Sequence, residues 1–188
     1  RAVLFECSDE QKERYLYPVI RGEKTACFAQ TEPDAGGDPA GMKTRAVLDG
    51  DHWVINGTKR FITGAGYSDF AQVMAVTDPG KRARGGITCF LVDMDTPGVT
   101  IERRWPTMMG DAPFQILFEN TRVPAGNVVG EVGQGFGLAQ SWLQEGRIKG
   151  HGARCIGIAE RALDMMMDYS QIRTTFGQPL SERQAVQF

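Results

Sequence analysis

The 188-residue sequence has little cysteine and histidine, no long apolar run and no excess of charge of one sign. Its four cysteines lie far apart without a CxxC pair, and with only two histidines a zinc or iron–sulfur site is not expected. No apolar run approaches the roughly 18 residues that cross a bilayer, and the N-terminal stretch has no signal-peptide pattern. Lys and Arg number 21 against 23 Asp and Glu, which excludes a general electrostatic attraction to nucleic acid or an anionic membrane. We therefore expect a soluble globular protein whose scattered thiols fit a reducing compartment.

The pattern of residues changes near residue 25. Before it, Ser8 with Gln11 three residues later predicts the capped start of a helix that runs to about Pro18. From about residue 25 to 132, short alternating or apolar runs between Gly, Pro, Asn and Asp are typical of a mainly antiparallel β domain. The predicted strands are Ala26–Gln30, Thr44–Leu48, His52–Phe61, Phe70–Thr77, Gly86–Val92, Val99–Trp105 and Phe114–Val123.

Turn residues lie between and within these strands. Asp49-Gly50 and Asn56-Gly57 are strong hairpin signals, and Asp78-Pro79-Gly80 and Pro97-Gly98 mark further turns. Seven short strands at this spacing predict a sandwich or a barrel.

A helical pattern follows the glycine-rich stretch 130–137. Small and apolar residues then recur every three or four positions, which predicts one core-facing side of a helix. These residues are Ile148, Gly152, Cys155, Ala159, Ala162, Met166 and Tyr169. Because a single helix cannot bury so broad a face, we expect further helices of a bundle to come from sequence beyond Phe188. The predicted fold class is α+β.

The stretch from Thr31 to Asp38, Thr-Glu-Pro-Asp-Ala-Gly-Gly-Asp, follows a predicted strand, and its glycines would let backbone amides approach a flat or anionic ligand. By itself the stretch is also typical of an ordinary glycine-rich connection. It is neither a Walker loop nor a dinucleotide fingerprint, and the glycines at 133–137 lack the βαβ setting that the fingerprint requires.

Four segments, taken together in order and spacing, resemble the acyl-CoA dehydrogenase family over nearly the whole chain. They are Phe28–Gly41 (family pattern Thr-Glu-Pro-x-Ala-Gly-Ser-Asp), Asn56–Thr63 (Gly-x-Lys-x-x-Ile-Thr), Arg122–Phe136 (Val-Pro, then Gly-Gly-Phe) and Tyr169–Gln184 (Tyr-x-x-x-Arg-x-x-Phe-Gly…Gln). The resemblance implies three parts: residues 1–24 end an N-terminal helical domain, 25–132 form the middle β domain with the flavin seat, and 133–188 begin a C-terminal helical domain.

The resemblance implies a bound FAD. Its isoalloxazine ring would be lined by Phe28, Gln30, Thr31, Gly36, Gly37, Phe61, Ile62 and Thr63. Thr63 would bond near flavin N5 and Thr31 at the N1/O2 edge, where such bonds stabilise charge on the reduced flavin. Strand packing is the alternative explanation of Phe61 to Thr63.

The resemblance also implies an oligomer, a dimer or tetramer, in which Arg173, Phe176 and Gln184 reach the flavin of a neighbouring subunit. Arg173 would bind the pyrophosphate with its planar fork; apart from the resemblance, the favourable helix dipole is the simpler explanation of an arginine near a helix C-terminus.

The substrate side rests on fewer residues. Arg147 would lie near the adenine and ribose of coenzyme A, and Gly37 stands where the family usually has Ser or Thr. Glu145 is a minor candidate for the catalytic base because it lies one residue away from the position used by a minority of members, a shift of about 100° around a helix. In most members the base is on a Glu-Gly-Thr loop, which would lie beyond Phe188. Asp111 stands near a position where several members carry a small polar residue.

The implied reaction is α,β-dehydrogenation of an acyl-CoA thioester, with an electron-transferring flavoprotein as electron acceptor, and we expect this stretch alone to be inactive. The expected location is the cytoplasm of a bacterium or the mitochondrial matrix of a eukaryote. Two alternatives remain open from the sequence: an acyl-CoA oxidase or flavin monooxygenase on the same fold, and a non-catalytic β-rich binding or scaffold module.

Overall fold

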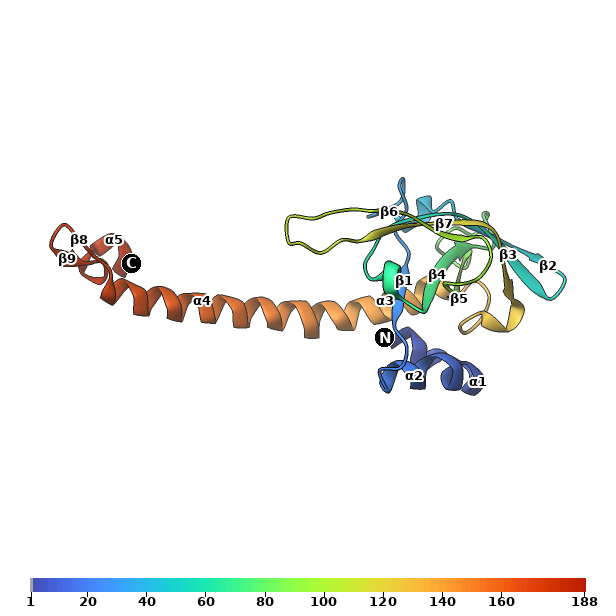
Figure 1. Cartoon of the computed structure of the whole chain (residues 1–188), viewed down its shortest axis with the longest axis horizontal. Helices are drawn as coiled ribbons and strands as arrows, with labels where there is room; N and C mark the ends of the chain where they lie inside the picture. The colour runs from blue at the N-terminus through green and yellow to red at the C-terminus, as the bar shows by residue number, and fades with distance from the viewer. Residues whose placement is uncertain (1) are drawn as a thin grey trace. The chain divides into compact units, whose positions relative to one another are not determined.

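The computed structural model describes residues 2–188, apart from the side chains of Ala2, Glu145 and Lys149. The chain divides into a first compact unit that ends at Trp142 and a second unit, Leu143–Phe188. Figure 1 shows both units, and its colour bar identifies each by residue number. Among the described residues, no helix is long and apolar enough to cross a membrane.

The first unit contains a strand in each of the seven predicted places. The strands are β1 (Ala26–Ala29), β2 (Arg45–Asp49), β3 (His52–Ile62), β4 (Phe70–Val76), β5 (Ile87–Asp93), β6 (Val99–Arg104) and β7 (Phe114–Pro124). Short helical turns connect them: η3 (Pro39–Gly41), η4 (Ala65–Tyr67) and η5 (Ala125–Asn127). The strand prediction is confirmed to within a residue or two at each end.

These strands form one curled sheet with two arms. One arm is the antiparallel series β2–β3–β7–β6, and the other is β1–β4–β5. The arms meet at a single pair, Arg45 with Val76. The sheet is mainly antiparallel, as predicted, but β1 runs parallel to β4. The predicted α+β class, with a barrel-like sheet and flanking helices, is confirmed.

Strand β4 is buried along its whole length because the sheet is covered on both faces there. Ala71 and Val73 point into a first core between the two arms, together with Phe90 and Phe118. The alternate residues of β4, such as Met74, belong to a second core beneath the helices. Period-two alternation of side chains on a strand produces this division.

Helical segments that precede β1 and follow β7 in the sequence cover the second core. They are η1 (Ala2–Glu6), the continuous helix formed by α1 (Asp9–Gln11), η2 (Lys12–Leu16) and α2 (Tyr17–Ile20), and α3 (Gly135–Glu145). The predicted capping box is confirmed: the Gln11 amide donates to the Ser8 hydroxyl at 3.2 Å, and the Ser8 amide donates to Gln11 Oε1 at 3.0 Å.

Of the two predicted hairpin signals, one is confirmed and one is wrong. Gly50 adopts a φ of 64° between β2 and β3, as a tight hairpin requires. Asn56-Gly57 lies instead inside β3, where a Cβ on Gly57 would come within 2.6 Å of the Thr44 Cα. Gly57 therefore allows another backbone segment to pack closely against the strand, which is a common reason for glycine within a strand.

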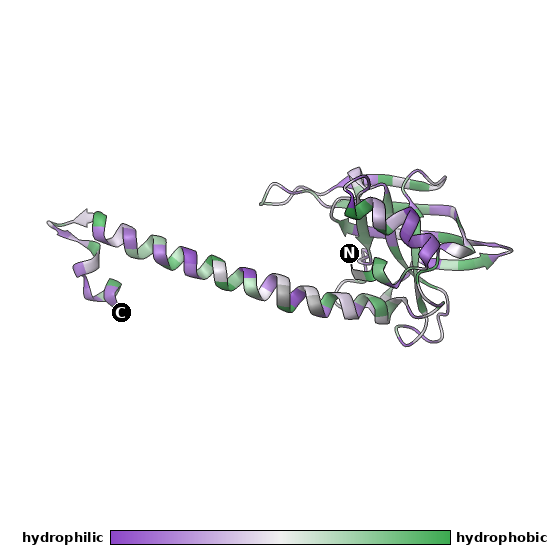
Figure 2. Cartoon of the chain, turned by 90° about the horizontal axis from the view of Figure 1, so that it is seen from below, coloured by the Kyte–Doolittle hydropathy of each residue, from purple (hydrophilic) through white to green (hydrophobic). Residues whose placement is uncertain are grey.

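The second unit is helical apart from a small hairpin. Its elements are η6 (Gly146–Gly152), α4 (Ala153–Ile172), β8 (Thr174–Thr175), β9 (Gln178–Pro179), η7 (Leu180–Glu182) and α5 (Gln184–Gln187). The predicted helix is confirmed, but α4 has no buried residue. Figure 2 shows hydrophobic and hydrophilic residues alternating along it.

Candidate functional site

The loop after β1 and the end of β3, the two segments predicted to hold a cofactor, lie side by side in the first unit. The Arg60 amide donates to the Thr31 carbonyl at 2.8 Å. The Lys59 ammonium donates to the Gln30 carbonyl at 3.1 Å. Segments about thirty residues apart in sequence are therefore joined by one backbone–backbone bond and one bond from a lysine side chain. We call the residues 30–37 and 60–63 the seat.

A buried ion pair lies at the junction of the two segments. Lys59 Nζ is 2.8 Å from Glu32 Oε1, and the two side chains are 0% and 3% exposed. Burial lowers the pKa of Lys59 to about 8, against the opposing effect of the Glu32 carboxylate. Burial acts to raise the pKa of Glu32, but Lys59 and hydrogen bonds from Thr44 and the Lys43 amide hold it below its usual range. The carboxylate therefore stays charged at neutral pH.

A β-bulge ends β3 and decides which way its last side chains point. The pairing with β7 shifts between Lys59 and Ile62, and Phe61 adopts a φ of 59°. As a result Phe61 is 53% exposed, whereas Ile62 is buried in the first core. A bulky residue in the left-handed region is strained, and such strain gathers at functional sites. The Phe61 ring is therefore accessible at the surface, whereas the Ile62 side chain is not.

An aromatic and cationic group surrounds Phe61. The ring of Trp105 lies edge-on to Phe61 at a centroid distance of 5.6 Å. The guanidinium carbons of Arg103 and Arg60 lie 3.8 and 5.2 Å from the centre of the Trp105 ring. Sequence reasoning missed Trp105, whose signal was an aromatic residue directly after two arginines at a strand end. Such a group offers aromatic surface and positive charge to a flat ligand.

Unpaired buried polar atoms in the seat and in Trp105 beside it fit a flavin. Among the described residues, Gln30 Oε1 and Trp105 Nε1 are buried and have no hydrogen-bond partner. A Cβ added at Gly36 or Gly37 would meet no heavy atom within 4 Å, so space is open beside the loop. A flat heterocycle with both N–H donors and oxygen acceptors would satisfy an orphan acceptor and an orphan donor of this kind.

The other predicted residues of the first unit differ in how far they are exposed to solvent. Thr31 is half-buried and Thr63 is exposed, so their hydroxyls lie at the edge of the protein. Phe28 is half-buried, and its ring packs against Trp142 at 5.1 Å in the second core.

The predicted residues of the second unit lie at the end of α4 and in the hairpin after it. Arg173 is the C-terminal cap of α4 and is exposed. Phe176 lies between β8 and β9 with a φ of 51° and is 99% exposed. Gln184, in α5, and Arg147, in η6, are also exposed. The side chain of Glu145 lies outside the described residues.

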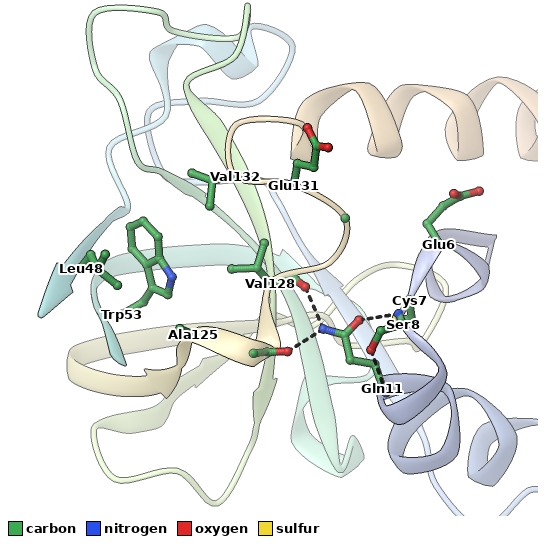
Figure 3. A pocket seen from close by; sticks show the side chains of 12 residues that line it. Glu6, Cys7, Ser8, Gln11, Leu48, Trp53, Ala125, Val128, Glu131 and Val132 are labelled. Atoms are coloured by element: carbon green, nitrogen blue, oxygen red, sulfur yellow. Dashed lines mark hydrogen bonds between the residues drawn. The ribbon is translucent and has the colours of Figure 1, made fainter. Parts of the chain in front are cut away.

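A separate hollow of about 700 Å³ lies on the first unit away from the seat. Figure 3 shows Trp53, Leu48 and Val132 on its walls together with Glu6 and Glu131. Gln11 lies in the same region, where its Nε2 donates to the carbonyls of Gly126 and Val128 at 2.7 Å each. The charged side chains that line this hollow are acidic, so it does not suit a phosphate-bearing ligand.

Comparison with known proteins gives two family matches and close relatives. The family description "acyl-CoA dehydrogenase, middle domain" matches residues 27–120, and "acyl-CoA dehydrogenase, C-terminal domain" matches residues 133–188. The human mitochondrial short-chain specific acyl-CoA dehydrogenase is 40% identical over 183 residues, which are 96% of this chain and 44% of that protein. The caffeyl-CoA reductase–Etf complex subunit CarC of Acetobacterium woodii is 41% identical over 188 residues, 99% of this chain and 49% of that protein.

A solved structure agrees in fold as well as sequence. The glutaryl-CoA dehydrogenase of Mycobacterium smegmatis, determined in complex with FADH2, superposes with a TM-score of 0.86 at 36% identity, covering 99% of this chain and 47% of that one. The chain thus spans about half the length of the relatives it matches.

A curled sheet followed by a long helix is an architecture that this chain shares with a class of flavoprotein oxidoreductases. Within that class, the chain belongs to the acyl-CoA dehydrogenase family.

Proposed function

We propose that this chain is the FAD-binding part of an acyl-CoA dehydrogenase that removes hydrogens from the α and β carbons of an acyl-CoA thioester. The observation that carries the proposal is the seat itself, in which the loop after β1 and the bulged end of β3 are joined by hydrogen bonds around an orphan acceptor on Gln30. The FADH2 bound to the similar glutaryl-CoA dehydrogenase supports FAD as the flavin.

The residues of the seat would bind and orient the ring system. Gln30 Oε1 would accept a hydrogen bond from a ring N–H, and the exposed ring of Phe61 would pack against the flavin. The Thr31 segment would donate to the N1/O2 edge and the Thr63 hydroxyl near N5. Bound flavin supplies the acceptor for the hydride equivalent that leaves the β carbon, and donors at these edges stabilise the negative charge that accumulates there.

The second unit would complete a neighbouring subunit's site. Arg173, Phe176 and Gln184 are exposed around the C-terminal end of α4, where they are free to reach a second copy. Arg173 would bind the pyrophosphate of that copy's FAD, since a guanidinium can bind two phosphate oxygens at once. The protein would accordingly be a dimer or tetramer.

Substrate binding and proton removal would involve further sequence. Arg147 would contact the adenine and ribose of coenzyme A, while a carboxylate outside these 188 residues, or Glu145, would remove the α proton. An electron-transferring flavoprotein would reoxidise the enzyme, as the name of the Acetobacterium Etf complex subunit suggests for that relative. The expected compartment is a bacterial cytoplasm or a mitochondrial matrix.

The test uses the full-length protein. We expect it to purify yellow, to release FAD on denaturation, and to be bleached anaerobically by a short-chain acyl-CoA. Transfer of electrons to an electron-transferring flavoprotein, rather than peroxide formation in air, would separate the dehydrogenase from an oxidase. A colourless protein that cannot be reconstituted with FAD would contradict the proposal and favour a scaffold module.

A matched pair of variants locates the flavin. Gln30→Leu should lower FAD occupancy because it removes the orphan acceptor from the seat. Gln72 is the control, since its amide is also buried and without a partner among the described residues but lies in β4. Gln72→Leu should leave FAD occupancy unchanged, and equal occupancy in both variants would place the flavin elsewhere.

A further inference from the structure

The buried pair of Glu32 and Lys59 has more hydrogen bonds than a simple ion pair. Glu32 Oε1 accepts from Lys59 Nζ at 2.8 Å and from the Thr44 amide at 3.0 Å. Glu32 Oε2 accepts from the Lys43 amide at 2.6 Å. Lys59 Nζ also donates to the Gln30 carbonyl. The pair therefore fixes three backbone segments to one another.

The three segments are the ones whose relative position defines the seat. Gln30 and Glu32 belong to the loop after β1, Lys43 and Thr44 precede β2, and Lys59 directly precedes the bulge that turns Phe61 outward. The loop is further closed on itself, since the Glu32 amide donates to the Ala35 carbonyl at 2.9 Å. A shift of Glu32 would therefore move the Thr31 and Gly36 backbone relative to Phe61.

Stability alone does not account for such a pair. Removing two charges from water is unfavourable, and a pair of apolar side chains of similar volume often stabilises a fold as well or better. Apolar side chains would fill the space, but they would not fix the direction of a carbonyl or an amide. Directional bonds matter where a ligand must meet donors from two segments at once.

We propose that Glu32 and Lys59 are positioning residues for the flavin. They hold the loop after β1 at one fixed distance from the end of β3, so that donors and acceptors of both segments meet the same ring. This inference rests on the proposed flavin-binding function. The two residues need not touch the cofactor, but changing them should alter its binding and its spectrum.

The test compares three forms of the full-length holoenzyme with the wild type. Glu32→Leu combined with Lys59→Met removes both charges and every hydrogen bond made by these two side chains while keeping the volume filled. Glu32→Gln keeps the shape, but a side-chain NH₂ group replaces one of the two carboxylate oxygens that accept hydrogen bonds from backbone N–H groups. Because an NH₂ group cannot accept such a bond, one donor is left facing another. Asp49→Asn combined with Arg122→Met is the control, because that exposed ion pair lies at the far end of β2, between Nη1 of Arg122 and Oδ2 of Asp49 at 2.6 Å.

Both seat variants should be folded at the temperature of the binding assay, although Glu32→Gln leaves Lys59 buried without its anion and should melt below the wild type. Both should bind FAD about 10-fold more weakly, the equivalent of one well-placed hydrogen bond. The absorption spectrum and reduction potential of the flavin that remains bound should shift. The control should match the wild type in all three measurements.

A purely structural role gives a different result. If the variants melt earlier but, while folded, bind FAD with the wild-type affinity and spectrum, the inference is wrong and the proposed function stands. If the double variant does not fold, Glu32→Gln decides by the same criteria. A wild type that takes up no FAD overturns the proposed function and this inference with it.

Discussion

The two units of the chain differ in where their apolar side chains lie. In the first unit, Leu91 of β5 is 0% exposed, and every residue of β4 is buried. In the second, Leu163 of α4 is 56% exposed and Ile172 is 76% exposed. Burial of apolar surface contributes roughly 25 cal/mol per Å². Within these 188 residues the first unit thus buries many apolar side chains, whereas no residue of α4 is buried.

This difference shows that a hydrophobic pattern in the sequence identifies the apolar face of an element but not the partner that buries it. The three-four spacing along α4 and the apolar run along β4 are equally clear in the sequence. A pattern states which face of an element is apolar, but it does not state what covers that face. Matched substitutions in the two units of the 188-residue chain measure how much this difference in burial changes the free energy of unfolding.

Breaking the buried ion pair should have the largest effect. Lys59→Met leaves the Glu32 carboxylate buried without its cation, which should lower the free energy of unfolding by about 3–5 kcal/mol. Arg161→Met, at an exposed position of α4, is the control and should leave the midpoint unchanged. Urea unfolding followed by circular dichroism measures both, and equal midpoints would mean that the pair is solvated.

A pair of leucines tests the burial difference directly. Leu91→Ala should cost about 3 kcal/mol, since it leaves a cavity in the second core. Leu163→Ala should cost less than about 0.5 kcal/mol, because its side chain is already in contact with water. The same denaturant measurement serves. In the full-length protein the cost of Leu163→Ala should rise if further helices cover α4, and an unchanged cost there would refute the predicted bundle.

Two glycines should respond in opposite directions. Gly57→Ala should cost about 2 kcal/mol because its Cβ would overlap the Thr44 backbone. Gly157→Ala in α4 meets nothing within 4 Å and should stabilise the helix by about 0.5–1 kcal/mol. Thermal unfolding shows the signs, and a stabilising Gly57→Ala would mean that the close approach of β3 to Thr44 is absent in solution.

Acid should weaken the first unit through Glu32, and this effect should be the smallest. The pKa of Glu32 is below its ordinary value of 4.5 in the folded state, so its contribution is present above pH 4.5 and is lost as the pH falls through the folded pKa. Stability measured between pH 7 and pH 3 should therefore decline more steeply in the wild type than in Glu32→Gln. Parallel curves would contradict the assignment.

The sequence predicted individual elements well because their signals are local. The strands, the Ser8–Gln11 capping box and the helix of α4 all depend on a few neighbouring residues. The prediction of a turn at Asn56-Gly57 was wrong because the reason for Gly57, contact with Thr44, comes from another segment. The parallel pairing of β1 with β4 also had no local signal.

The site was predicted only in part for the same reason. The resemblance singled out the loop after β1 and the end of β3, but it gave no reason for them to meet. The position of Lys59 could have indicated its burial from the sequence. Lys59 lies an even number of residues after Trp53 and Ile55 in the same strand, and both of those residues are buried. A lysine at such a position requires a buried carboxylate, and Glu32 supplies it. The roles assigned to individual flavin contacts stay predictions.

The small hairpin after α4 is held by interactions among its own residues. The Arg183 guanidinium donates to the Thr175 carbonyl at 2.7 Å and lies 5.6 Å from the centre of the Phe176 ring. The Leu180 amide donates to the Arg173 carbonyl at 2.9 Å. Such interactions lower the conformational entropy that the hairpin would lose on binding. A surface that binds this hairpin would therefore select a fixed shape, and its affinity would depend little on ordering the loop.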